Sequence, residues 1–266
     1  MGESKKNIMN VEKFLQRLWE SYISYTPSAE KISKLFGERV INDHIAFRTF
    51  NLDKCNIYKQ ADFLSSYGYK VCGDYFFEQK RLQAIHLENI DPVHPKIFLS
   101  ELICEDFTDE LRIIINDISD SFSDNPEDLL IGGRTWDIDY DKYELLAKES
   151  EYASWLYVWG FCPNHFTVSV NHLANFNDLS DVNNMIKNEG YLLNSSGGEI
   201  KGSIAELLEQ SSTMADKVKV NFGSCAAEIP SCYYEFAKRY PEVNGNLYQG
   251  FVAKSADKIF ESTDSS

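Results

Sequence analysis

The 266-residue sequence predicts an α+β fold in which two βαβββ modules form one cupped, mixed sheet. Three observations support this prediction. The order strand, helix and three strands occurs twice along the chain, and the apolar residues change from helical to alternating spacing where each copy begins. Each copy also carries a histidine in its first strand and a glutamate in its last strand. We expect helices before the first module and a helical insertion between the two.

A helical N-terminal segment is expected over residues 1–38. Apolar residues from Val11 to Ile23 recur every three or four positions, which is typical of a helix with one buried face. A second helix is expected from Ser28 to Phe36, because Gly37 follows it. The stretch from Met1 to Asn10 is polar, so we expect no secretion signal there.

The first module is expected over residues 39–105. Its opening strand, from Ile41 to Arg48, alternates between polar and apolar side chains. A helix should follow from Ile57 to Ser66 and end before Gly68. Three further runs have strand character: Tyr69 to Phe77, Leu82 to Glu88, and Lys96 to Ile103.

The helical insertion is expected over residues 106–160, where Leu111, Ile114, Ile115 and Ile118 keep helical spacing. The second module and a C-terminal segment then occupy residues 161–266. Their expected elements are a strand from Asn164 to Asn171, a helix from Ser180 to Asn188, a short helix opened by the capping box Ser203 to Glu206, and strands at Tyr191–Leu193, Lys217–Phe222 and Ser231–Phe236.

Both first strands have one polar face. Because side chains alternate along a strand, His44 shares a face with Arg48, and His165 shares a face with Thr167 and Ser169. The opposite faces are apolar and should contact helices. Polar side chains inside a cup are unfavourable unless they bind something. This pattern therefore predicts a binding site on the inner face of the sheet.

Two histidines and one carboxylate that leave three coordination positions open are typical of non-haem iron(II) oxygenases. His44 and His165, one from each module, are the candidate pair. Either histidine alone would more often be a hydrogen-bonded core residue, but their matched placement favours metal binding. His86 is expected to pack across strands, His94 to lie in a turn and His172 to face away. We therefore expect residues 1–266 to form one metal-binding enzyme domain.

Three glutamates are candidates for the carboxylate ligand. Glu235 lies in an aromatic strand, where an unpaired charge would be unfavourable and a bound cation would compensate it. Glu228 lies near the start of that strand and is more often solvated. Glu101 is the counterpart in the first module. The sequence favours Glu235, then Glu228, then Glu101, and leaves the choice open.

Arg48 follows His44 by four residues on the same face, a separation of roughly 13 Å along a strand. That spacing suits a guanidinium that binds the far carboxylate of a small diacid whose near end chelates the metal. A surface salt bridge is an equally good interpretation of this arginine.

Composition excludes several classes of function. The formal charge of −15 disfavours binding to nucleic acids. No apolar run reaches the roughly 20 residues that a membrane helix needs. The six cysteines contain no CxxC pair, so we expect all six to be structural thiols in a cytoplasmic protein.

Four segments together resemble the 2-oxoadipate dioxygenase/decarboxylase family, also called hydroxyglutarate synthase. They are Asn42–Thr49, Asn164–Thr167, Ile229–Phe236 and the tail Phe251–Phe260. The resemblance implies a vicinal-oxygen-chelate fold. It also implies iron(II) held by His44, His165 and Glu235, a substrate clamp at Arg48, and Ser255 in the substrate pocket.

The family's reaction, implied by the same resemblance, converts 2-oxoadipate and dioxygen to 2-hydroxyglutarate and carbon dioxide. The chain is shorter than the bacterial lysine-catabolism members, which bears on substrate identity more than on metal chemistry. Two alternatives remain: another metal-dependent lyase, isomerase or hydrolase on the same scaffold, or a non-catalytic protein that binds small acids. The sequence does not indicate which oligomeric state the protein adopts.

Overall fold

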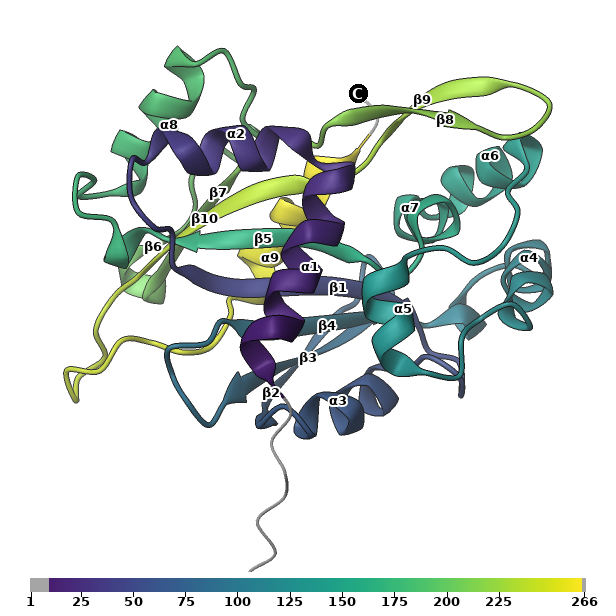
Figure 1. Ribbon diagram of the computed structural model, residues 1–266, viewed down its shortest axis with the longest axis horizontal. Coiled ribbons are helices and arrows are strands. Elements are labelled where there is room, and N and C mark those ends of the chain that lie inside the picture. Colours follow the sequence, from purple (N-terminus) through teal and green to yellow (C-terminus); the bar gives the residue numbers. More distant parts are fainter. Residues whose placement is uncertain (1–9, 265–266) are drawn as a thin grey trace, which may run out of the picture.

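A computed structural model describes residues 10–264, so the polar start over residues 1–9 lies outside the described part. Its centre is an eight-stranded mixed sheet with the strand order β2-β3-β4-β1-β5-β10-β7-β6 (Figure 1). The strands are β1 (Asn42–Phe50), β2 (Tyr69–Phe77), β3 (Leu82–Asn89), β4 (Lys96–Leu102), β5 (Pro163–Ser169), β6 (Lys201–Ser203), β7 (Leu208–Ser212) and β10 (Tyr233–Arg239).

The strand order has the expected internal symmetry. Strand β1 pairs in parallel with β4, β5 pairs in parallel with β10, and β1 and β5 are antiparallel neighbours at the centre of the sheet. Ile45 lies opposite Phe166, with His44 opposite Thr167 and Ala46 opposite His165. A local twofold axis at the Ile45–Phe166 pair therefore makes His44 and His165 equivalent positions. The prediction of two βαβββ modules is confirmed.

Helices α1 (Val11–Tyr25) and α2 (Pro27–Leu35) cover the outer face of the sheet (Figure 1). The side chain of Asn10 caps α1 by accepting a hydrogen bond from the Lys13 amide at 2.9 Å. Trp19 then packs edge-on against Phe166 of β5, with ring centroids 5.1 Å apart. The apolar stripe of α1 thus covers the apolar side of β5 and leaves the polar side of that strand facing inward.

The inner face is covered by the C-terminal segment, which contains α9 (Ala253–Ile259) and the 3-10 turn η4 (Phe260–Thr263). Figure 1 shows α9 on the side of the sheet opposite α1. Several backbone and side-chain hydrogen bonds fix this segment, including Ala215 N–H to the Ser262 carbonyl at 2.9 Å and Asn194 to the Lys258 carbonyl at 3.0 Å. The C-terminal segment is therefore held over the inner face of the sheet.

The remaining helices lie around the sheet. Each module has its own helix, α3 (Ile57–Ser65) or α8 (Leu179–Asn188), and the region expected to be a helical insertion contains α4 (Asp109–Ser119), α5 (Pro126–Gly132), α6 (Tyr140–Glu149) and α7 (Glu151–Trp159), with the turn η1 (Cys104–Asp106) before them. Two further 3-10 turns are η2 (Val170–His172) and η3 (Ile204–Glu206); the capping box predicted the second. Within residues 10–264, no helix combines the length and the apolar character needed to cross a bilayer.

The second module differs from the prediction in several of its strands. Tyr191–Leu193 is not a strand and contributes a single bridge, between Leu193 and Thr213. The run at Lys217 is a strand, β8 (Lys217–Asn221), but it pairs with β9 (Ala226–Pro230) in a separate hairpin that projects from the sheet (Figure 1). The sequence prediction missed three strands, β6, β7 and β9, and of these β7 contributes a residue to the cavity. The inward residues of β7, Gln210 and Ser212, are polar because they face the cup, so β7 lacks apolar alternation.

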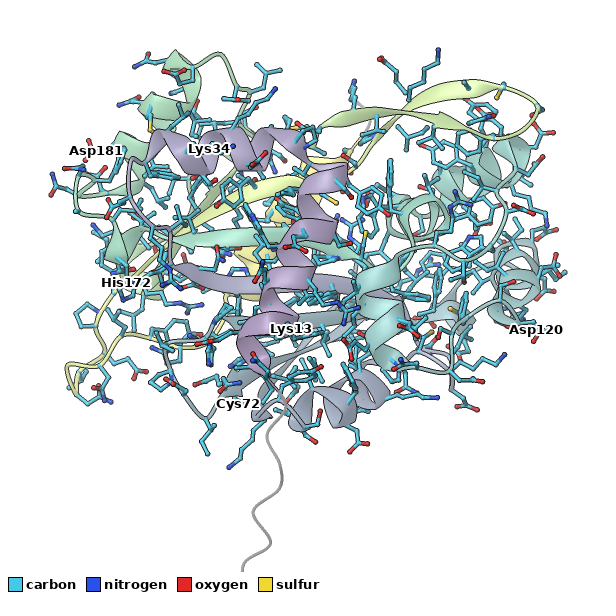
Figure 2. All side chains as sticks on the ribbon, viewed as in Figure 1. Lys13, Lys34, Cys72, Asp120, His172 and Asp181 are labelled. Atoms are coloured by element: carbon cyan, nitrogen blue, oxygen red, sulfur yellow. The ribbon has the colours of Figure 1, made fainter. Side chains whose placement is uncertain are left out.

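The cysteines are free thiols, as expected, but not all are core residues. Cys55, Cys104 and Cys162 are buried, as is Cys232. Cys72, on β2, is exposed at the surface (Figure 2), and so is a sixth thiol in the β8–β9 turn. The prediction that all six are structural is therefore wrong for these two.

Candidate metal centre

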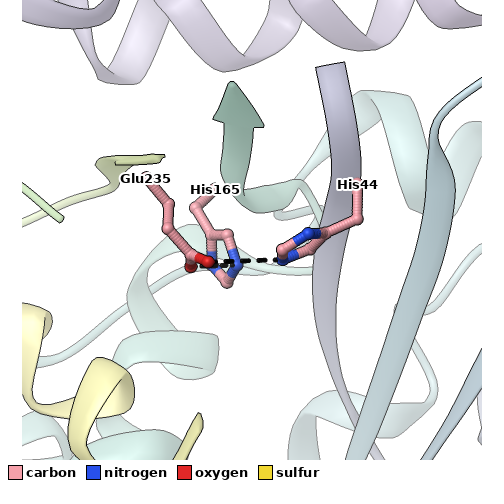
Figure 3. Close-up of side chains that lie close together, drawn as sticks. All are labelled: His44, His165 and Glu235. Atoms are coloured by element: carbon pink, nitrogen blue, oxygen red, sulfur yellow. Dashed lines mark ion pairs between the residues drawn. The ribbon is translucent and has the colours of Figure 1, made fainter. Parts of the chain in front are cut away.

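Three side chains that carry metal-ligand atoms meet on the inner face of the sheet. His44 of β1, His165 of β5 and Glu235 of β10 point toward one another (Figure 3), and one ligand atom from each lies within 4.8 Å of the other two. His165 Nε2 is 3.1 Å from Glu235 Oε2, and His44 Nε2 is 3.6 Å from Glu235 Oε1. All three residues are buried.

The strand register explains why these residues meet. His165 lies opposite Ala46 on one side and opposite Tyr233 on the other. Glu235, two residues beyond Tyr233, therefore shares the inner face with His165. His44 is one strand away on the same face. Three adjacent strands thus place two nitrogens and a carboxylate at one point of the cup.

Each imidazole is oriented by a neighbouring oxygen on its own strand. His44 Nδ1 lies 2.8 Å from Asp43 Oδ1, and His165 Nδ1 lies 3.0 Å from Asn164 Oδ1. An oxygen that accepts from Nδ1–H fixes the tautomer and leaves the lone pair of Nε2 directed toward the cluster. The Thr167 hydroxyl lies 3.0 Å from His44 Nε2. Both histidines can therefore bind a cation through Nε2.

The surroundings of His165 and Glu235 favour the protonation states in which they can bind a metal. Burial lowers the pKa of His165, against the opposing effect of Glu235, so the imidazole stays neutral. Burial alone raises the pKa of Glu235, but His165, His44 and a hydrogen bond from Gln210 at 2.6 Å outweigh it and lower the pKa overall. Apart from its contact with His165 Nε2, Glu235 Oε2 has no hydrogen-bond partner within the described chain. A buried carboxylate oxygen in this state is suited to a cation.

The cluster borders a small cavity of about 20 Å³. The sheet supplies its floor with the three candidate ligands, Phe98, Gln210 and Tyr233, and the C-terminal segment supplies its roof with Phe251, Ala256, Ile259 and Phe260. This volume accommodates about one water-sized particle. A six-carbon acid is larger than this volume.

The chain is similar in sequence to known proteins. A sequence profile of the 2-oxoadipate dioxygenase/decarboxylase family matches residues 133–245. A protein of Oryza sativa subsp. japonica, named 2-oxoadipate dioxygenase/decarboxylase, chloroplastic/amyloplastic, is 34% identical over 288 residues, which span 96% of this chain and 77% of the rice protein. The chain belongs to the 2-oxoadipate dioxygenase/decarboxylase family.

Solved structures related to this family member cover nearly the whole chain. Hydroxyglutarate synthase from Oryza sativa, in complex with 2-oxoadipate, is 30% identical with a TM-score of 0.91, over 98% of this chain and 94% of that one. A protein of Shewanella frigidimarina with a provisional hydrolase name is 51% identical with a TM-score of 0.88, over 92% of this chain and 98% of that one. A glyoxalase-superfamily protein of Ralstonia eutropha shares the fold at 19% identity, with a TM-score of 0.72 over 90% and 84% of the two chains.

The other two candidate carboxylates of this family member lie away from the cluster. Glu101 is opposite Thr49, an odd number of positions from the inward-facing Ala46–Phe98 pair, so it faces outward. There it accepts a hydrogen bond from the Ile57 amide at the start of α3, at 2.9 Å. Glu228 is exposed in the β8–β9 hairpin, opposite Lys219. The residue equivalent to Glu235 in the first module is Phe98, so the interpretation of Glu101 as its counterpart is wrong.

Arg48 is on the inner face, as predicted, but it is not a surface residue. It is 1% exposed, and its guanidinium donates to Glu151 at 2.9 and 3.2 Å and to the Thr263 hydroxyl at 2.9 Å. Its Cζ atom lies 4.9–5.8 Å from three aromatic ring centroids, including that of Phe260 in the cavity roof. The surface salt bridge interpretation is therefore wrong, whereas the role in substrate binding stays a prediction.

The remaining histidines and Ser255 are not part of the cluster. His86 packs between strands, 2.9 Å from the Tyr75 hydroxyl, and His172 is exposed at the edge of the molecule (Figure 2). Ser255 is buried in α9, but the residues of that helix that border the cavity are Ala256 and Ile259. Its part in a substrate pocket is untested.

Sequence reasoning missed three groups that support the site. Gln210 donates a hydrogen bond to Glu235, and Asp43 lies at hydrogen-bond distance from His44 Nδ1. Arg239 donates from Nε and Nη2 to Asp43, at 2.7 and 2.8 Å. Gln210 belongs to the missed strand β7. Asp43 was available as a signal, because a carboxylate next to a candidate ligand is a common orienting group, but its arginine partner lies far along the chain.

Proposed function

We propose that this protein is an iron(II)-dependent dioxygenase that converts 2-oxoadipate and dioxygen to 2-hydroxyglutarate and carbon dioxide. The observation that carries the proposal is the buried His44–His165–Glu235 cluster, in a chain whose rice relative was solved in complex with 2-oxoadipate. Both oxygen atoms of dioxygen enter the five-carbon product, one in the carboxylate formed at the former oxo carbon and the other in the new hydroxyl group. Carbon dioxide leaves with the two oxygens of the original carboxylate, so the reaction needs no further oxidant.

The donor set fits iron(II). Two neutral imidazoles and one carboxylate are the ligands of the facial triad of iron(II) oxygenases, which keeps coordination positions open for substrate and dioxygen. When bound, iron(II) supplies the redox chemistry with dioxygen and a chelation point for a 2-oxo acid. The close approach of His165 Nε2 to Glu235 Oε2, at 3.1 Å, supports this fit, as does the orientation of both imidazoles by Asp43 and Asn164.

The protein's own residues bind and orient the substrate. Arg48 is the proposed clamp for the distal carboxylate, since a guanidinium matches a carboxylate in both charge and geometry. Phe251, Ile259 and Phe260 of the roof exclude water from the metal end of the cavity. Because the closed cavity is far smaller than a six-carbon diacid, we propose that the C-terminal segment moves outward to admit the substrate.

The test is anaerobic loading of the protein with iron(II), followed by mixing with 2-oxoadipate and oxygenated buffer. Equal amounts of oxygen consumed, carbon dioxide released and 2-hydroxyglutarate formed are expected. The same protein loaded with zinc or manganese is the control for metal identity. Turnover with zinc and no oxygen uptake would indicate a lyase, isomerase or hydrolase instead. Binding of one 2-oxoadipate per chain by protein that takes up no metal would indicate a non-catalytic binding protein.

A further inference from the structure

Tyr233 places a phenol beside the metal cluster. It precedes Glu235 by two residues on β10, so it shares the inner face, and it lines the cavity. Its ring is stacked on the imidazole of His165, with centroids 4.5 Å apart and planes inclined by 23°. From the outer side of the sheet, the Tyr22 hydroxyl donates to the Tyr233 backbone carbonyl. Both the backbone and the ring of Tyr233 are thus fixed in place.

The Tyr233 hydroxyl has no hydrogen-bond partner within the described chain, although the residue is fully buried. Two other buried tyrosines have a partner for their hydroxyl group. The hydroxyl of Tyr69 donates to the Pro95 carbonyl at 2.9 Å, and that of Tyr152 donates to the Ser100 carbonyl at 2.7 Å. A buried hydroxyl without a partner destabilises a fold, so such groups are uncommon unless they serve a function. Phenylalanine would provide the same stacking without this penalty.

We propose that the Tyr233 hydroxyl donates a hydrogen bond to an oxygen of the bound substrate, at the oxo or carboxylate end of a 2-oxo acid. This inference rests on the proposed function and adds a residue that contacts the substrate. The phenol is protonated at neutral pH and carries one donor proton, and the acceptor atoms of a 2-oxo acid are all oxygens. A stacked ring next to a ligand histidine allows little motion, so the donor is preorganised.

The test is Tyr233→Phe, which removes one oxygen atom and keeps the ring. Calorimetric titration of 2-oxoadipate into the iron-loaded, oxygen-free protein should give a Kd raised about 5- to 15-fold, the effect of one lost hydrogen bond. The melting temperature of the ligand-free protein should stay the same or rise, since the removed hydroxyl has no partner. Weaker ligand binding without a loss of stability separates a substrate contact from a structural role.

Tyr234→Phe is the matched control. Tyr234 is the next residue on the same strand but faces outward, where its ring lies 6.0 Å from that of Trp19. Its loss of a hydroxyl should leave the Kd within twofold of the wild-type value. If the wild-type protein binds 2-oxoadipate and Tyr233→Phe binds it equally well, the inference is wrong and the proposed function survives. If the wild-type protein binds no 2-oxo acid, both are wrong.

Discussion

Arg239 and Asp43 form a buried, two-pronged ion pair although they are 196 residues apart in sequence. Asp43 is the second residue of β1, next to His44, and Arg239 ends β10, the strand that carries Glu235. Arg239 also donates to the carbonyls of Tyr248 and Gly250, at 3.0 and 2.8 Å, in the loop that leads to the cavity roof. One arginine thus connects the orientation of a candidate ligand to the loop before the C-terminal segment.

The first prediction concerns this pair. Asp43→Asn should weaken iron(II) binding by about 10- to 100-fold, because the carboxylate that orients His44 and makes it more basic is lost. The free energy of unfolding should also fall, by about 3 kcal/mol, because Arg239 loses its buried counter-charge. Chelator competition and urea denaturation measure the two effects. Asp74→Asn, on the exposed part of β2, should change neither; iron affinity unaffected by Asp43→Asn would remove Asp43 from the site.

The second prediction distinguishes the carboxylates. Glu235→Gln should abolish stoichiometric iron binding, because an amide oxygen carries no charge to neutralise the cation. Glu101→Gln should retain one iron per chain and lower the free energy of unfolding by about 1–2 kcal/mol, since its hydrogen bond to the Ile57 amide at the start of α3 is weakened. Elemental analysis and urea denaturation of both variants provide the comparison. Iron retained by Glu235→Gln would rule out the proposed ligand set.

The two glutamates also show what could be predicted from the sequence. Alternation along β1 and β5 placed His44 and His165 on one face correctly, because period-two spacing is local information. The register between β1 and β4 is set by contacts far apart in sequence, so the sequence did not reveal that Phe98, rather than Glu101, is equivalent to Glu235. The residues that precede Glu101 in β4 resemble those that precede Glu235 in β10. The pairing of β4 with β1 and of β10 with β5 nevertheless places the two glutamates at different positions of the sheet.

Strand β7 and the partners of Arg48 could not be predicted from the sequence for physical reasons. Strand β7 carries inward-facing Gln210 and Ser212, so the polar lining that builds the site also removes the hydrophobic pattern by which strands are recognised. The face of Arg48 followed from alternation. Its neighbours Glu151 and Thr263 come from the start of α7 and the end of the chain, and only the folded arrangement brings them to it.

The third prediction tests Arg48 as a carboxylate clamp. Arg48→Ala should raise the Kd for 2-oxoadipate by about 10-fold or more, because a charge-assisted hydrogen bond of roughly 1.5–3 kcal/mol is lost. Binding of 2-oxohexanoate, which has no distal carboxylate, should change little. Iron content should stay at the wild-type value. Calorimetry with both acids measures the change in Kd that the substitution causes for each. An equal rise in Kd for both acids would mean that Arg48 stabilises the fold of the cup rather than binding the distal carboxylate.

The last prediction concerns Lys201, a buried lysine on β6 opposite Gln210. Its ammonium group donates to the Asn194 carbonyl, and within residues 10–264 no carboxylate lies at ion-pair distance from it. Burial lowers its pKa to about 8, despite the opposing effects of Glu235 and other acidic groups. In the unfolded chain a lysine keeps its proton up to a pKa of about 10.4.

Between about pH 8 and pH 10.5 the unfolded state therefore binds more protons than the folded state at this position. The free energy of unfolding rises with pH wherever this holds. Lys201→Met removes the group, so the wild-type protein should gain stability relative to Lys201→Met as the pH rises from 7 to 10. Urea denaturation of both proteins at each pH measures this difference, and Lys254→Met, at an exposed position of α9, should give a constant difference from wild type. A difference for Lys201→Met that also stays constant would mean that the ammonium keeps its proton in the folded protein, stabilised by the Asn194 carbonyl and the acidic groups around it.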